Sequence, residues 1–326
     1  MKRSKLLTLV VIVLLVSVLA GACTSQPSEP ALPAEKEPGT ITTIITITRD
    51  FGRELMLGET LAVLPDTSAM AALMEVAEVE TAYGGGFVNA INGVRSGYAG
   101  TQKTKADWFF YVHGIQSNVG ALDYKLHDGD IQHWDFHGWG FRHFIPAIID
   151  VFPSAFRYGF GGRVSPTLIV CPEYLKEDVV KLEAKLAQLE VRDVGIRSLD
   201  ELSESERGNS NIILVSGLGN SLISELNQNW QRLGFFAYFE NGNLVVINGR
   251  GEVTDKYGAG TGLIQATQNP WNPKGVGACE NVVWLVSGTD EVGVENALDA
   301  LLDQHNKMQY TAAVVVVDDK IIKVPQ

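Results

Sequence analysis

Residues 106–136 read ADWFFYVHGIQSNVGALDYKLHDGDIQHWDF, and this stretch decides how the first half of the chain folds. Its run WFFYV at 108–112 consists of aromatic and β-branched residues, which favour a partly buried strand. The pair HG follows as a turn, and the later Asp-Gly pair at 128–129 forms another because it readily supplies positive φ angles. Residues 130–136 then alternate with a period of two. The stretch therefore predicts two strands that carry an unusual number of Trp, Tyr and His side chains.

The segments that flank this stretch predict a small α+β domain over residues 41–141. Polar residues at 65–68 can cap a helix. Its apolar stripe is Ala69, Leu73, Val76 and Ala77, and the glycines at 84–86 are expected to end it. The remaining strands are predicted from β-branched runs between turn residues. We expect one helix on a mixed sheet, with strands at 41–48, 54–57, 87–91, 108–112 and 130–136.

The motif DWFFYVHG, the DGD turn and the Trp-bearing strand after it resemble the transcobalamin C-terminal-like domain family over residues 41–137. His113 departs from the pattern, because the family more often has Asn there. The resemblance implies a β-grasp-like fold, and in cobalamin-carrying members this domain covers one face of the bound cobalamin. It therefore implies a corrinoid or a related flat ligand for this chain. The residues predicted to bind it are Trp108, Tyr111, His113, Tyr124, Asp130 and Trp134.

Five of the six histidines lie between residues 113 and 143, at positions 113, 127, 133, 137 and 143. A neutral imidazole can ligate cobalt, zinc or haem iron. One hypothesis is thus a metal or corrin ligand, with His113 as the first candidate, and a bound metal stays open. The alternative is that these histidines lie on a solvated sheet surface. The aromatic run has a similar alternative, since Trp108 and Phe110 share one face, Phe109 and Tyr111 the other, and either pair can belong to the core.

The first 40 residues predict export and anchoring. A basic start and an apolar run at 6–19 precede the sequence LAGAC, which resembles a lipobox. The run is shorter than the ~20 residues of a membrane span. The resemblance implies cleavage before Cys23 and lipid attachment to it, so residues 1–23 are read as a lipoprotein signal peptide. A plain secretory signal or an uncleaved anchor are the alternatives. Residues 24–40 are rich in Pro, Ser and Glu and predict a disordered tether.

Composition excludes one class of partner and leaves other questions open. A net charge of −12 argues against nucleic acid, which requires a basic surface. Cys171 and Cys279 could form a disulfide in an oxidising compartment, or could simply be buried. The second half of the chain lacks a recognisable Ser-His-Asp set. No catalytic set is therefore recognised and no intrinsic cofactor is expected, and an extracellular enzyme stays open as a third alternative.

Beyond a connector at 142–165, with a short helix expected at 147–151, the pattern changes to alternating strands and helices. This alternation predicts an α/β sandwich with a largely parallel sheet over residues 166–326. Two similar segments, NIILVSGLGNSLISEL and NVVWLVSGTDEVGVENAL, each consist of a strand, a Ser-Gly loop and a helix. Together with residues 258–265 and the sequence NPWNP at 269–273, they are similar to archaeal surface-layer proteins. That resemblance implies a structural or interaction module.

Two functions follow from these observations. The first is a lipid-anchored protein on the outside of the membrane that captures a corrinoid or a related flat ligand between its two domains, since clefts between domains often hold ligands. The second is a surface-layer or adhesion-type module that binds envelope protein or glycan and takes no small molecule. A deep cleft at Trp108, Tyr111, His113 and Trp134 would favour the first function. Side chains packed inside a closed surface would favour the second.

Overall fold

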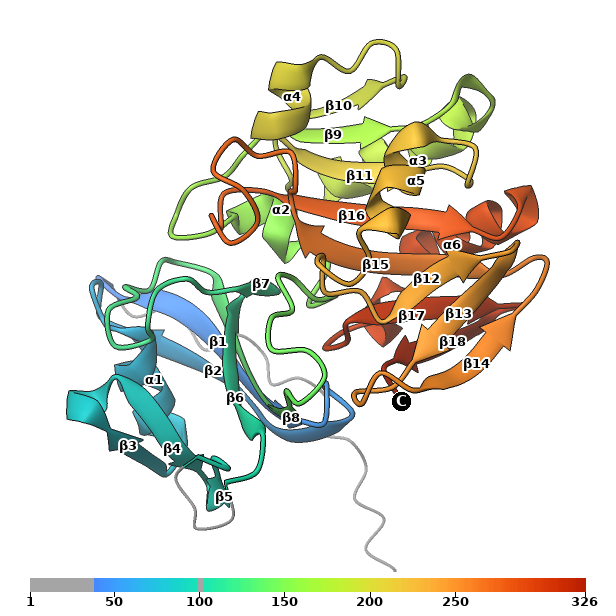
Figure 1. Cartoon of the computed structure of the whole chain (residues 1–326). Coiled ribbons are helices and arrows are strands. Elements are labelled where there is room, and N and C mark those ends of the chain that lie inside the picture. Colours follow the sequence, from blue (N-terminus) through green and yellow to red (C-terminus); the bar gives the residue numbers. More distant parts are fainter. Residues whose placement is uncertain (1–37, 99–102) are drawn as a thin grey trace, which may run out of the picture. The chain divides into compact units, whose positions relative to one another are not determined.

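The computed structural model describes residues 38–98 and 103–326, and these residues fall in a single compact unit. The predicted signal peptide, the lipidated Cys23 and most of the tether lie outside the described residues. Within the described part of the chain, no helix has the length and apolar character needed to cross a membrane. The α+β fold class is confirmed (Figure 1).

The first part of the chain forms a mixed five-stranded sheet in the order β2-β1-β8-β6-β7. Strand β1 runs parallel to β8, and the other pairings are antiparallel. One helix, α1, packs on this sheet, and the side chain of Ser68 caps it by accepting a hydrogen bond from the Ala71 N–H, as expected of a polar N-cap. The bounds are β1 (Ile41–Arg49), β2 (Glu54–Val63), α1 (Ala69–Val76), β6 (Ala106–Val112), β7 (Ile115–Gln116) and β8 (Asp130–Gly138).

Helix α1 is shorter than predicted, because it ends at Val76 and not at the glycines 84–86. The next residue, Ala77, is extended, with φ −141° and ψ 149°. The residues that follow pair with β4 as a hairpin strand, and Asn92 Oδ1 accepts the N–H of Glu78 at 2.9 Å. For the residues after Val76, pairing with β4 therefore determines the conformation, and the helical pattern in the sequence does not. This small sheet has the order β3-β4-β5, with β3 (Val79–Ala82), a 3₁₀ turn (Tyr83–Gly85), β4 (Phe87–Ile91) and β5 (Val94–Arg95).

The second part is built on a seven-stranded sheet in the order β10-β9-β11-β16-β15-β17-β18. Its first four strands are parallel, and the pairings from β16 to β18 are antiparallel. A separate antiparallel sheet has the order β12-β13-β14. The bounds are β9 (Thr167–Val170), β10 (Val194–Arg197), β11 (Asn211–Val215), β12 (Ala237–Glu240), β13 (Asn243–Ile247), β14 (Val253–Tyr257), β15 (Gly262–Gln268), β16 (Val282–Gly288), β17 (Ala313–Val317) and β18 (Lys320–Val324).

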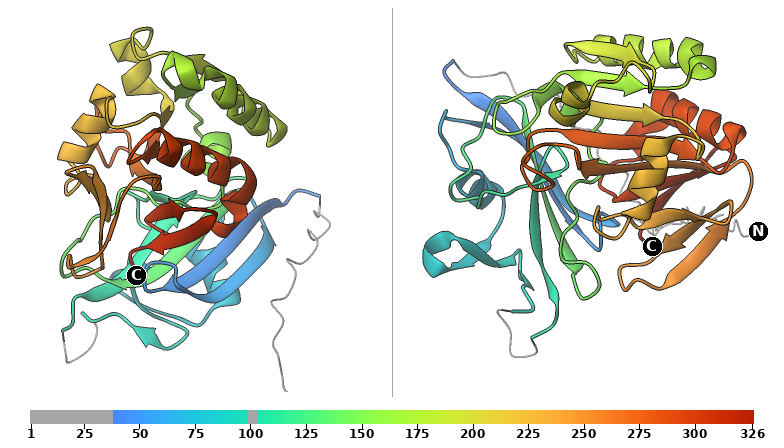
Figure 2. Two further views of the ribbon diagram at one scale, coloured as in Figure 1. Left: turned by 90° about the vertical axis from the view of Figure 1, so that its right-hand side faces the viewer. Right: turned by 45° about the horizontal axis from the view of Figure 1, so that its top comes forward.

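Both faces of this sheet are covered by other elements. Successive strand residues point to opposite sides, so neighbouring residues pack in different clusters. Ile169 and Ile213 pack in the cluster that holds helices α3 and α6, whereas Leu168 and Ile212 pack in the cluster that holds α5 and the β12–β14 sheet. Figure 2 shows these helices beside the strands. The helices of this part are α2 (Ser154–Tyr158), α3 (Lys176–Gln188), α4 (Glu204–Asn209), α5 (Ser221–Gln228) and α6 (Glu291–Gln304), with 3₁₀ turns at Glu173–Leu175 and His305–Lys307.

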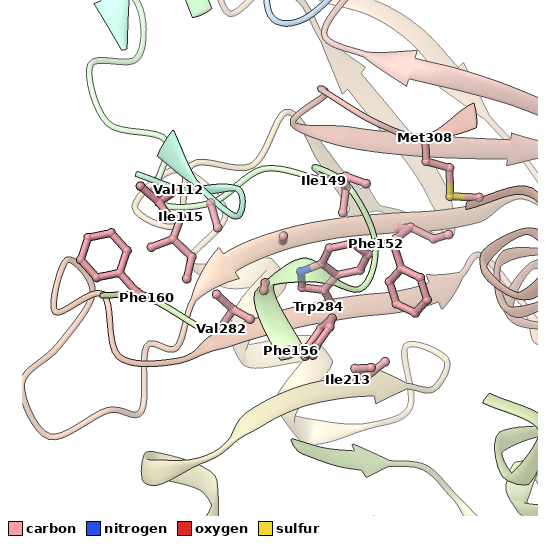
Figure 3. Packing of buried hydrophobic residues seen from close by; sticks show 14 of the residues in the cluster. Val112, Ile115, Ile149, Phe152, Phe156, Phe160, Ile213, Val282, Trp284 and Met308 are labelled. Atoms are coloured by element: carbon pink, nitrogen blue, oxygen red, sulfur yellow. The ribbon is translucent and has the colours of Figure 1, made fainter. Parts of the chain in front are cut away.

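The connector at 142–165 is part of the core. The short helix predicted at 147–151 does not form. Instead Ala147 and Ile149 make bridges to Ile115 and Thr311, and α2 begins at Ser154. Backbone bridges to strand β7 and to the segment before β17 explain the extended conformation. Figure 3 shows the cluster that results, in which Trp284 lies 5.6 Å from the ring of Phe152 and 5.3 Å from that of Phe156. The domain boundaries at 141 and 166 remain a prediction.

Candidate functional site

Strand β6 presents its aromatic residues to two different environments. Trp108 and Phe110 belong to one hydrophobic cluster, and Phe109 and Tyr111 to the other, as the period of two predicts. The neighbouring strand β8 alternates in the same way, so Trp134 stacks on Phe110 with ring centroids 4.6 Å apart. The sheet therefore has an apolar face, which carries Trp108, and a mixed face, which carries Tyr111.

Five of the six predicted ligand residues are buried. Their exposed fractions are 1% for Tyr111, 2% for His113, 4% for Tyr124, 2% for Asp130 and 2% for Trp134. Trp108 is partly exposed. A single deep cleft that joins Trp108, Tyr111, His113 and Trp134 is not present in the described structure. Between the mixed face and residues 145–148 and 310–312 there is a space of only ≈ 10 Å³, and Trp108 and Trp134 line a separate groove. A space of ≈ 10 Å³ holds about one water molecule.

His113, Tyr124 and Asp130 form one hydrogen-bonded cluster. Asp130 accepts three hydrogen bonds: from His113 Nε2 at 3.1 Å, from the Tyr124 hydroxyl at 3.1 Å and from the N–H of His127 at 2.9 Å. Tyr124 in turn accepts the N–H of Gly161 at 3.1 Å. Burial, followed by the charge of Asp130, raises the pKa of Tyr124. These partners hold the DGD turn, which explains the burial of the three side chains without a ligand.

A second polar cluster, on the mixed face, was not predicted. Asp135 accepts hydrogen bonds from Thr48 Oγ1 at 2.6 Å, from His137 Nδ1 at 2.6 Å and from the backbone N–H of Gly52 at 3.0 Å. His137 lies between the rings of Phe51 and Phe109, at 4.4 and 4.1 Å. Burial pushes the pKa of Asp135 upward, but the hydrogen bonds and the nearby imidazoles outweigh it, and the pKa is lowered. Residues 133, 135 and 137 lie two positions apart and therefore on the same face of a strand, and this spacing is the sequence feature that could have predicted the cluster.

His133 connects this cluster to a buried carboxyl group. Because Thr48 donates to Asp135, its oxygen accepts from His133 Nε2, 2.7 Å away. His133 Nδ1 has no hydrogen-bond partner among the described residues, whereas the backbone N–H groups of Gly114 and Val151 partly offset the burial of the Asp150 carboxylate. Burial lowers the pKa of His133 and raises that of Asp150. Asp150 is thus a buried acid whose charge is incompletely compensated.

The prediction that the histidines lie on a solvated surface is wrong for three of them. His113, His133 and His137 are buried at 2%, 1% and 4% exposure, whereas His127 and His143 reach solvent. The Nε2 atom of His113 is taken by Asp130. Among residues 38–98 and 103–326, no group of three or more His, Cys, Asp or Glu side chains is placed to hold a metal ion.

The apolar face of the sheet opens into a groove of ≈ 260 Å³. We call it the aromatic groove. Trp108 and Phe110 are only partly buried along it, and Trp108 Nε1 donates to the Val94 carbonyl at 3.1 Å, which fixes the indole. Phe87 of β4 and the exposed Val119 of the loop after β7 also line it. This groove is the part of the aromatic cluster that a ligand can reach from solvent.

The second part of the chain offers a polar pocket of ≈ 320 Å³ after strands β9 and β10. The carboxyl edge of a parallel sheet is a common ligand position. The two cations that line it are already paired, Lys176 with Glu173 at 3.4 Å and Arg197 with Glu206 at 3.1 Å. Cys171 lies at its base as a buried free thiol with a pKa raised by burial to about 11. The pocket therefore lacks an unpaired cation.

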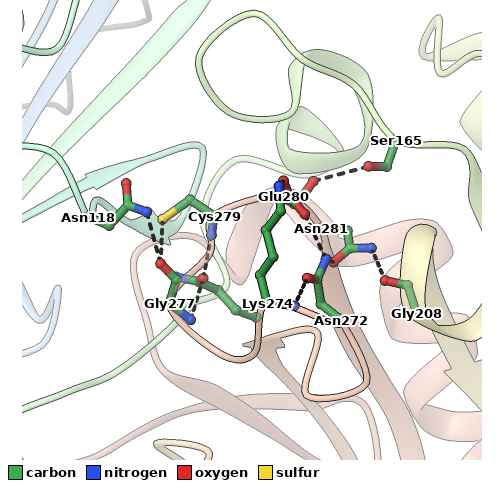
Figure 4. Close-up of polar contacts among 10 residues, drawn as sticks. Asn118, Ser165, Gly208, Asn272, Lys274, Gly277, Cys279, Glu280 and Asn281 are labelled. Carbon is green, nitrogen blue, oxygen red and sulfur yellow. Dashed lines mark hydrogen bonds and ion pairs between the residues drawn. The ribbon is translucent and has the colours of Figure 1, made fainter.

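The residues behind the surface-layer resemblance make internal contacts. Figure 4 shows the loop at 272–281, where Asn272 Nδ2 donates to Asn281 Oδ1 at 3.0 Å. Asn281 Nδ2 donates to the Gly208 carbonyl at 3.0 Å. Cys279 is a free buried thiol that donates to the Gln116 carbonyl at 3.3 Å, so the two cysteines are not paired. These side chains hold the loop against the fold.

The comparisons with known proteins concern mainly the first part of the chain. A family described as "Domain of unknown function (DUF4430)" matches residues 66–138, which contain α1 and the strands from β3 to β8. No curated protein matches this chain. The aromatic groove and the His113 cluster thus lie mostly within a segment that matches a family of unknown function.

Two solved structures show a limited likeness. One is haptocorrin in complex with Cbi, at 12% identity and a TM-score of 0.26, covering 32% of this chain and 27% of that chain. The other is a Ruminococcus gnavus ATCC 29149 protein described as a "putative metal binding protein", at 13% identity and a TM-score of 0.23, covering 30% of this chain and 97% of that one. The match thus spans about a quarter of haptocorrin and nearly all of the second protein.

Proposed function

We propose that this protein is a lipid-anchored binding protein on the outer side of a cell membrane, and that its ligand rests on the aromatic groove. The observation that carries this proposal is the pair Trp108 and Phe110, held at partial exposure on a rigid sheet above ≈ 260 Å³ of open space. Such rings bind flat apolar surfaces well. The lipid anchor is inferred from the sequence of residues 1–23 alone. The proposed role is binding without catalysis.

The finer proposal is that the ligand is a corrinoid. It is supported by the sequence resemblance of residues 41–137 to a domain that covers one face of cobalamin. The groove is slightly smaller than the roughly 300–1,000 Å³ of enclosed small-molecule pockets. It therefore fits contact with one face or edge of a large flat ligand. The buried His113 is not proposed as an axial ligand, because its side chain is fully covered.

The test is a titration of the purified chain with cobinamide and with cobalamin, followed by absorbance and calorimetry. Saturable binding at micromolar concentration, weakened by Trp108→Ala, supports corrinoid capture at the groove. If neither compound gives heat or a spectral change, a corrinoid is excluded as the ligand.

A surface-layer or adhesion-type module is the second candidate. The observation that favours it is the burial of five of the six predicted ligand residues within hydrogen bonds and packing. Its partner would be a protein or glycan of the envelope. If the protein binds purified envelope material and does not bind corrinoids, the surface-layer or adhesion function is favoured over corrinoid capture.

A further inference from the structure

Arg142 is a buried cation without a counter-ion. Its side chain belongs to a residue that is only 7% exposed, and Nη1 donates to the Gln231 carbonyl. The atoms Nε and Nη2 have no hydrogen-bond partner within the described part of the chain. No carboxylate there lies within ion-pair distance either. An unpaired buried charge is costly, so side chains such as this one are normally compensated.

Aromatic rings surround this guanidinium. Its carbon lies 5.1 Å from the ring centroid of Phe141, 5.1 Å from that of Phe236 and 5.5 Å from that of Trp230. Cation–π contacts stabilise a cation, but they leave its N–H donors unused. Burial lowers the pKa of Arg142 to about 10, so the group stays charged at neutral pH.

Arg142 is one of the residues that line a pocket of ≈ 420 Å³. This volume lies within the range of small-molecule sites. The pocket lining contains two further basic side chains, His143 and Arg232, and no acidic one; the other lining residues are Phe141, Phe144 and Gln231. In a chain with a net charge of −12, such a concentration of positive charge is unusual. None of these residues lines the aromatic groove.

We propose that this pocket binds a small acid that joins an aromatic or apolar group to an oxyanion, with Arg142 as the anchoring cation. The planar fork of an arginine matches the two oxygens of a carboxylate or a phosphate. Arg232, which is exposed, supplies the second positive charge at the rim. In this proposal the oxyanion reaches Nε and Nη2 by displacing the ring of Phe141, which is 40% exposed.

The test is calorimetric titration of the full-length chain in detergent with phenyl phosphate, benzoate and inorganic phosphate. We expect saturable binding of phenyl phosphate or benzoate, and the tighter of the two identifies the oxyanion. Arg142→Lys keeps the charge but loses the fork, and should weaken binding at least about tenfold. Arg232→Gln, on an exposed residue that should not affect folding, should weaken it about twofold to fivefold.

The matched control is Arg192→Gln, which removes an exposed arginine that does not line the pocket and should leave the affinity unchanged. The proposal is overturned if neither aromatic acid binds at about 10 mM, a concentration that would detect even weak complexes. It is also overturned if Arg232→Gln binds as tightly as Arg192→Gln. Equal affinity for inorganic phosphate and phenyl phosphate would overturn the aromatic part of the assignment.

Discussion

The two faces of the five-stranded sheet carry similar aromatic side chains and differ in what covers them. On the apolar face, Trp108 and Phe110 remain partly open along the groove. On the mixed face, Tyr111 and His133 are sealed by Tyr310 and by residues 145–148. The comparison teaches that an aromatic strand becomes a binding surface only where no other part of the chain packs against it. The sealed face instead holds the hydrogen-bond network of Asp135.

The largest expected effect is on the sealed face. Asp135→Ala removes the acceptor of Thr48, His137 and two backbone N–H groups, and leaves these donors buried. We expect a loss of roughly 3–5 kcal/mol in the free energy of unfolding, measured by urea denaturation. Asp123→Ala, at an exposed position, is the control and should change the free energy of unfolding by less than about 0.5 kcal/mol. Equal effects would mean that the Asp135 network does not stabilise the sealed face.

The second effect is a pH dependence of stability that arises from His133. Burial holds its pKa below the ordinary value of 6.5, so the unfolded chain binds a proton that the folded chain does not. This contribution is fully present above pH 6.5 and is lost as the pH falls toward the folded pKa. The free energy of unfolding should therefore fall as the pH drops below 6.5, with a slope that cannot exceed about 1.4 kcal/mol per pH unit, the limit for one proton. Unfolding of His133→Asn measured over the same range should show a flatter slope, and an unchanged slope would exclude His133 as its source.

The third effect concerns Asp150, which also lies beside the sealed face. Its folded pKa is raised by burial, so the charged carboxylate opposes folding at neutral pH. Asp150→Asn should therefore raise the free energy of unfolding at pH 7, because the neutral amide does not carry the buried charge. The gain should disappear as the pH falls below 3.8, where both folded and unfolded carboxyl groups are protonated. A loss of stability at pH 7 would show that the charge is compensated.

The sequence predicted which residues share a face, but not which face is sealed. The alternation of WFFYV, the DGD turn and the cap at Ser68 follow from local rules, and the structure confirms them. The partners of the sealed face are distant in the chain: Thr46 meets Tyr310 across 264 positions. No local pattern contains such a contact. The alternating residues at 78–81 did carry a strand signal, which the helical stripe before them obscured.

Substitutions on the apolar face, along the aromatic groove, should have the smallest effect on the free energy of unfolding. They should change ligand binding instead. Val119 lines the aromatic groove at 39% exposure, and Val180 on α3 is 48% exposed and lies outside it. Either valine can be replaced by arginine with a change below about 0.5 kcal/mol in the free energy of unfolding. The two substitutions therefore differ only in whether they block the groove.

The most direct test of the proposed function is the cobinamide affinity of the unmodified chain, of Val119→Arg and of Val180→Arg, measured by absorbance titration. We predict saturable binding by the unmodified chain and by Val180→Arg, and a loss of at least about tenfold for Val119→Arg, equivalent to about 1.4 kcal/mol. Equal binding by all three proteins, or no binding by any of them, would contradict the account of the aromatic groove as the corrinoid-binding surface.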